Sequence, residues 1–213
     1  MALYFAWFAG RWISAGFTPD DLMNLHRSLE QPLWRLLLDH LTVFLPTPEY
    51  RPVGSLFYRM IYQAFGFTPL PFHVALYAFL AANIYLTYLV VRRLTGLAAA
   101  GLVAAVLHAW HGNWTGLHFS VAYCFDVLCY FFYASALVAF GAGRLWWFFG
   151  LFLLCLNAKE VAVSLPLVCL VWKCRDCRRS RKVKILERAE TMGDVRHAPN
   201  GFGKTLRVQF WTV

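Results

Sequence analysis

The sequence predicts an all-α protein, a multi-pass transmembrane helical bundle with interfacial amphipathic helices in its first outer loop. Of the 213 residues, 60% are hydrophobic and only 15% are charged, whereas a soluble domain is close to half apolar and a quarter charged. The apolar residues form long runs, and basic residues cluster beside those runs, as they do in membrane proteins. Too few polar side chains remain to cover a soluble core, so lipid is the expected solvent.

Six apolar segments are expected to cross the membrane within a transmembrane domain of residues 1–173. A helix needs about 20 residues to span a bilayer, and segments 70–91 and 119–140 reach that length. Segment 97–110 is shorter and rich in Ala and Gly, which suits close helix packing. The remaining segments are short: 2–17, 145–156 and 161–172. We count them as spans because every basic cluster then falls on the same side of the membrane.

Residues 18–69 are predicted to form the first outer loop, because charges, His and Pro appear there between amphipathic pieces. Segments 33–45 and 53–65 both mix aromatic and charged residues at helical spacing. Helices of this kind lie flat at a membrane interface.

The basic residues predict the orientation of the chain. Arg92, Arg93 and Arg144 fall on one side with the run 173–182 if every segment crosses, and that side is expected to be cytoplasmic. The first outer loop and the polar turn at 157–160 then share the opposite, non-cytoplasmic side.

Residues 174–213 are polar, basic and aperiodic, and we expect a disordered cytosolic tail. The formal net charge of +9 is concentrated beside the apolar runs, so we assign it to a membrane partner and exclude nucleic acid. The expected location is the cell membrane, and within that a bacterial inner membrane.

The sequence Thr18-Pro19-Asp20-Asp21 allows two interpretations. Thr as N-cap, Pro at the first helical position and an acid at the third form a helix-start signature. Two adjacent carboxylates just outside a membrane are also a candidate general base or metal site, with Asn24 one turn further along the same face.

Four charged residues elsewhere are candidates for a second role. Arg51 is either a headgroup anchor or a cation that binds a phosphate through its planar fork of donors. Lys159 and Glu160 form either a surface turn or part of the same aqueous site. Asp126, about two turns into its span, is a functional candidate because an ionisable group at that depth is costly, unless it is a paired structural acid.

Three other sequence features give weaker indications of function. The histidines at 73, 108, 111 and 118 lack a compact metal-ligand spacing, so the metal requirement stays unknown, with a divalent ion as one possibility. Residues 198–205 loosely resemble a phosphate-binding loop but lack its strand and helix context. The pair Cys174 and Cys177 is a lone CxxC with too few ligands nearby for structural zinc.

The order of these motifs resembles the N-terminal part of the GT-C class of membrane glycosyltransferases, closest to its protein O-mannosyltransferase-like members. The residues that carry the resemblance are FTPDDLMNLH after the first span, YRPVGSLFYRMIYQAFGFTPLPFHVALYAFL, and NAKEVAVSLPLVCLV. It covers roughly residues 1–173, and the run from "RP" through "P…H" is its most specific part.

The resemblance implies an activity and its site. Such proteins transfer a sugar from a polyprenyl-phosphate donor to an acceptor on the non-cytoplasmic side. Asp20 or Asp21 would be the catalytic base, while Arg51, Lys159 and Glu160 would bind the donor phosphate. The implied partners are membrane lipid and the polyprenyl-phosphate-sugar donor.

Three questions stay open at this point. The predicted spans stop at residue 172, so the chain is expected to be the N-terminal part of such a glycosyltransferase, including the case of a truncated, inactive fragment. Whether it is an active hexosyltransferase-like enzyme is therefore undecided. The alternative function is a non-enzymatic multi-pass subunit for assembly or transport. The sugar, the acceptor and the oligomeric state are not predicted.

Overall fold

The computed structural model describes residues 7, 10, 13–30, 32–39, 51–112 and 116–194, and every regular element in these ranges is helical. Side chains within them are described except at 37, 39, 179–180, 182–183 and 185–194. The chain divides into two compact units, Met1–Cys169 and Leu170–Val213. The all-α prediction is thus confirmed for the described part of the chain. Most of the predicted first span, 2–17, lies outside the described residues.

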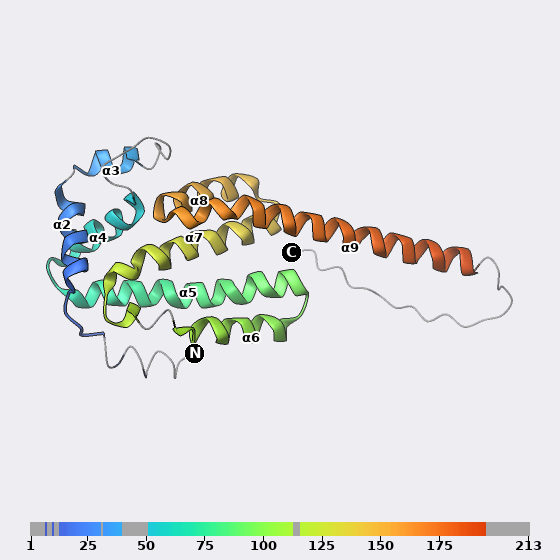
Figure 1. Cartoon of the computed structure of the whole chain (residues 1–213), viewed down its shortest axis with the longest axis horizontal. Coiled ribbons are helices and arrows are strands. Elements are labelled where there is room, and N and C mark those ends of the chain that lie inside the picture. The colour runs from blue at the N-terminus through green and yellow to red at the C-terminus, as the bar shows by residue number, and fades with distance from the viewer. Residues whose placement is uncertain are drawn as a thin grey trace. The chain divides into compact units, whose positions relative to one another are not determined.

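Four helices form a layer in the first unit (Figure 1). They are α5 (Pro69–Thr95), α6 (Ala98–Ala109), α7 (Cys124–Gly141) and α8 (Leu145–Ala158). Helices α5 and α7 run in one direction, and α6 and α8 run in the other (Figure 1). Helix α5 packs between α6 and α7, and α8 packs on the other side of α7. The turn after α5 uses Gly96 in the left-handed conformation, at φ 77°, where its amide donates to the carbonyl of Arg92.

Two segments, Pro69–Thr95 and Val121–Gly141, are long and apolar enough to cross a membrane. They coincide with the expected spans 70–91 and 119–140. Helices α6 and α8 are apolar but have only 12 and 14 residues. Large apolar side chains are strongly exposed on both, with Trp146 91% and Leu107 66% accessible. Apolar patches of this kind mark surfaces that contact something other than water.

Close helix packing explains two glycines. A Cβ at Gly101 of α6 would lie 2.8 Å from the Tyr88 carbonyl oxygen on α5, as the Ala- and Gly-rich sequence predicts. A Cβ at Gly54 would lie 1.9 Å from a ring carbon of Phe125, so α4 (Pro52–Phe65) and α7 approach each other where no side chain fits. The Gly54 contact therefore determines how closely α4 packs against α7.

The expected first outer loop contains three described helices. Helices α2 (Pro19–Glu30) and α4 pack against each other, and α4 also contacts α3 (Leu33–Asp39), α7 and α8. Helix α4 agrees closely with the expected segment 53–65, and it buries Val53, Phe57 and Tyr58. The C-terminal part of the expected helix 33–45 lies outside the described residues.

Arg93 and Arg144, two of the basic residues expected to share one side, lie at one end of the layer. Arg93, near the end of α5, donates to the carbonyl of Val138 near the end of α7 at 2.7 Å. Arg144 follows α7 directly and precedes α8. The opposite end holds the starts of α5 and α7 and the end of α8, which is where the candidate site residues are found.

Helix α9 (Leu165–Asp194) runs from the first unit into the second. We expected a disordered tail from residue 174, but the backbone is helical through Asp194. Lys, Arg, Glu and Ala are good helix formers, and extending an existing helix avoids the cost of nucleation. Residues 195–213, which include the phosphate-loop-like sequence, lie outside the described residues.

Candidate functional site

The acidic pair at the start of α2 is divided by the structure. Asp21 is fully buried, whereas Asp20 is exposed. The Thr18 amide donates to Asp21 Oδ2 at 2.8 Å, and the Asp21 amide donates to Thr18 Oγ1 at 3.3 Å. This reciprocal pair is a capping box. The helix-start interpretation is therefore confirmed, and the capping acid is Asp21.

Asp21 also binds a distant part of the chain. Its Oδ1 accepts from the Ala122 amide at 2.7 Å, from Ser120 Oγ at 2.9 Å and from the Tyr58 hydroxyl at 3.4 Å. Burial, together with the nearby Cys124 and Asp21, raises the pKa of the Tyr58 phenol well above its usual value, so this hydroxyl stays protonated and donates. A carboxylate that accepts from several buried donors is a strong cross-link between elements.

Asp20 is the acid of this pair that a ligand can reach, because it lies exposed at the second position of α2. Asn24 follows one turn later and is half-buried. A carboxylate with water access can take a proton from an incoming hydroxyl, whereas Asp21 has its oxygens occupied by donors. The two acids therefore have separable roles.

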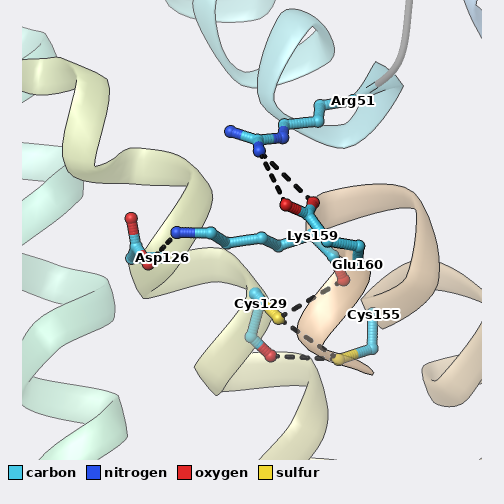
Figure 2. A network of polar contacts seen from close by, with 6 residues as sticks. All are labelled: Arg51, Asp126, Cys129, Cys155, Lys159 and Glu160. Carbon is cyan, nitrogen blue, oxygen red and sulfur yellow. Dashed lines mark hydrogen bonds and ion pairs between the residues drawn. The ribbon is translucent and has the colours of Figure 1, made fainter. Parts of the chain in front are cut away.

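Arg51, immediately before α4, binds Glu160 across 109 residues of sequence. Arg51 Nη2 lies 3.1 Å from Glu160 Oε1 and 3.3 Å from Oε2 (Figure 2). The Arg51 guanidinium also lies over the Phe125 ring, 5.6 Å from its centroid. Both charged side chains are partly exposed, at 34% and 48%. The guanidinium is thus oriented on one side by a ring and on the other by a carboxylate.

Lys159, the neighbour of Glu160, has a different partner. Figure 2 shows its side chain extending to Asp126 in the first turn of α7, with Nζ 2.5 Å from Oδ1. The sequence left Asp126 open between a functional and a paired structural acid, and the structure gives it a cationic partner. The two ion pairs form a row of alternating charge that joins α4, η4 (Glu160–Ser164) and α7.

The structure brings the predicted phosphate-binding residues together. The candidate site residues as a whole, however, form two groups rather than one cluster. Arg51, Lys159 and Glu160 meet with Asp126, whereas Asp21 binds residues 120–122. The start of α7 and the residues just before it contact both groups, because Ala122 binds Asp21 and Asp126 binds Lys159. Both groups therefore occupy the end of the helical layer opposite Arg93 and Arg144.

Sequence reasoning missed Ser120 and Tyr58 as partners of Asp21. Each is an ordinary residue in its own segment, and neither has a spacing that indicates a contact with α2. It also did not predict the contact between Cys129 and Cys155, whose sulfur atoms lie 3.7 Å apart. These contacts depend on how the helices pack, which local pattern does not encode.

Among the described residues, no three or more His, Cys, Asp or Glu side chains are grouped so that they could hold a metal ion. Of the histidines considered, His118 instead forms a 2.8 Å hydrogen bond with the Tyr77 hydroxyl and stacks on its ring. The positive charge near these acids comes from Arg51 and Lys159, each of which is paired with a carboxylate.

The Arg51–Glu160 pair predicts a pH dependence. A hydrogen bond from its own backbone amide, and then the charge of Arg51, lower the pKa of Glu160 below its usual value. A lowered pKa means that the pair stabilises the fold above the unfolded-state pKa and that this contribution is lost as pH falls through the folded value. Thermal unfolding of wild type and Glu160→Gln should therefore differ at pH 6 and converge once the pH falls below the folded-state pKa of Glu160.

The expected difference is small, at most about 1 kcal/mol, because the pair is partly exposed and screened by solvent. Glu30→Gln is the matched control, since Glu30 is an exposed acid on α2 whose partner is His26, four residues away. A Glu160→Gln protein that matches wild type at pH 6 would show that the ion pair contributes nothing.

No protein-family model, curated protein or solved structure matches this chain.

Proposed function

We propose that the chain is a multi-pass membrane protein of the glycosyltransferase type that transfers a sugar from a polyprenyl-phosphate donor on the non-cytoplasmic side. The observation that carries the proposal is the meeting of Arg51, Lys159 and Glu160 at the end of the layer that also holds Asp20. The cationic ends of α5 and α8 would face the cytoplasm. The membrane would be a bacterial inner membrane, with helices α6 and α8 as thin spans beside the two long ones.

The proposed chemistry assigns one task to each group. Asp20, as the exposed acid, takes the proton of the acceptor hydroxyl as that oxygen attacks the sugar. Arg51 and Lys159 stabilise the negative charge on the departing phosphate. Glu160 competes with the donor for Arg51, because both oxygens of its carboxylate accept from Arg51 Nη2, and a phosphate bound at that nitrogen would exchange with them.

This exchange can be tested with a polyprenyl monophosphate and the purified full chain in detergent. Arg51→Gln should weaken binding about tenfold, because a charge-assisted hydrogen bond is lost. Glu160→Gln should bind as tightly as wild type or more tightly, because it removes the competing anion and keeps the cation. Arg93→Gln, at the opposite end of α5, is the matched control and should bind like wild type.

The opposite directions of the two variants separate phosphate binding from a structural role. If Arg51 and Glu160 only tie α4 to η4, both substitutions should break the same contact and change binding alike. Equal weakening by Arg51→Gln and Glu160→Gln, or no binding by wild type, would overturn the assignment of Arg51.

One observation favours the second candidate function, a non-enzymatic multi-pass subunit for assembly or transport. Arg51 and Lys159 are each neutralised by a carboxylate, Glu160 and Asp126, so the row of charges is already balanced. Such pairs can serve only to hold helices together. This candidate predicts that substitution of Asp20 changes no transfer activity, a result that would exclude the enzyme.

A further inference from the structure

The buried thiols of Cys129 and Cys155 lie between α7 and α8, close to the ion pairs. Cys129 Sγ and Cys155 Sγ lie 3.7 Å apart, and Figure 2 shows them facing each other between the two helices. Cys155 Sγ also donates to the Cys129 carbonyl oxygen at 3.2 Å. Cys155 is fully buried and Cys129 is 6% exposed. The two side chains are therefore held against each other by the packing of the helices.

The other described cysteines lack this arrangement. Cys124 and Cys169 are buried singly, and Cys174 and Cys177 lie exposed on α9. Among the described residues, the sulfur–sulfur contact within hydrogen-bonding distance is the one between Cys129 and Cys155. A buried thiol by itself is a small apolar residue, but two thiols in contact can react with each other.

We propose that Cys129 and Cys155 form an oxidisable dithiol that closes to a disulfide between α7 and α8. A disulfide bond is about 2.05 Å long, so the sulfur atoms must approach by about 1.7 Å from their 3.7 Å separation. Rotation of two facing side chains supplies movement on this scale without separating the helices. Neither residue belongs to the proposed donor site, so the inference is independent of the proposed function.

The reaction needs a small apolar disulfide as oxidant. One thiol loses its proton, and its thiolate attacks a sulfur of the oxidant, releasing the first oxidant thiolate. The second thiolate then attacks the mixed disulfide and releases the other half of the oxidant. Two electrons pass from the dithiol to the oxidant, which leaves as two thiols after taking up the two protons.

The position of the dithiol gives the bond a structural consequence. Cys129 Sγ lies 4.0 Å from the Lys159 carbonyl oxygen, to which it donates, and Cys129 is on the same helix as Asp126. Oxidation removes this donor and ties α7 covalently to the end of α8. The bond would therefore fix the helix that carries Asp126 to the turn that carries Lys159.

The test uses the full chain in detergent and the aromatic disulfide 2,2′-dithiodipyridine, which enters apolar surroundings. After the oxidant is removed, the protein is unfolded and labelled with N-ethylmaleimide, and the number of labels is measured by mass spectrometry. A Cys174→Ser, Cys177→Ser double variant avoids reaction at the exposed pair and retains four of the six cysteines. We expect four labels before oxidation and two afterwards, with a linked Cys129–Cys155 peptide on digestion.

Two further variants keep the test specific. Adding Cys155→Ser should abolish the linked peptide and leave at most a thiopyridyl adduct on Cys129, whereas adding Cys169→Ser should leave one label from three after oxidation. Four labels after oxidation, or a linked peptide that contains another cysteine, would overturn the proposal. The result with the Cys174→Ser, Cys177→Ser protein needs no substituted core residue, so a core variant that fails to fold does not decide the outcome.

Discussion

Replacing Asp21 with alanine is expected to lower the free energy of unfolding by about 3 kcal/mol or more. The substitution removes the acceptor of the Thr18 and Ala122 amides and of the Ser120 hydroxyl. These donors are partly buried, and a polar group that is shielded from water and left without a hydrogen-bond partner lowers the stability of the fold. Denaturant unfolding in detergent micelles, followed by circular dichroism, measures the change.

Asp20→Ala is the matched control, since Asp20 is the adjacent acid and is exposed. Its only expected contribution is a favourable interaction with the start of α2, worth at most about 1 kcal/mol. Equal destabilisation by the two substitutions would contradict the role of Asp21 as a cross-link between α2 and residues 120–122.

Replacing Asp20 with asparagine is expected to reduce sugar transfer by about 100-fold or more, the usual cost of losing a general base. Asparagine keeps the size of the side chain and the helix start but cannot accept the acceptor's proton. The measurement is transfer of label from polyprenyl-phosphate hexoses to acceptors in membranes that contain the full chain. Unfolding should change little, which separates this effect from that of Asp21.

Glu30→Gln removes a carboxylate from the other end of α2 and should leave transfer unchanged. Its partner is the exposed His26, and neither side chain contacts the Asp21 cross-link or the ion pairs. If Asp20→Asn retains the activity of Glu30→Gln, or if wild type transfers no label, the catalytic role of Asp20 is wrong.

The two long apolar helices could be predicted because hydrophobicity sustained over about 20 residues is a local signal. The capping box was also readable, since Thr18 and Asp21 are three residues apart. The contact between Asp21 and Ala122 was not, because it spans 101 residues. It depends on how α2 packs beside the start of α7, which no local pattern records.

The ion pairs show the same limit. Lys159 and Glu160 are neighbours and could be read as one pair, but consecutive residues leave an irregular turn in different directions. The structure gives each a separate partner, Asp126 and Arg51. The length of helix α9 was not predicted for another reason. Its polar half lacks a periodic apolar face, but it continues a helix that has already begun.

The cross-link from Asp21 to Ala122 has a consequence for the order in which the chain is made. A ribosome adds about 5–20 residues per second, so Ala122 emerges about 5–20 s after Asp21. Until then the nascent α2 keeps its Thr18 cap but lacks the donors from residues 120–122. A chain stalled before residue 120 should therefore leave Asp21 hydrated and reactive toward carboxyl-directed reagents. The carboxylate becomes buried only after residues 120–122 have been synthesised.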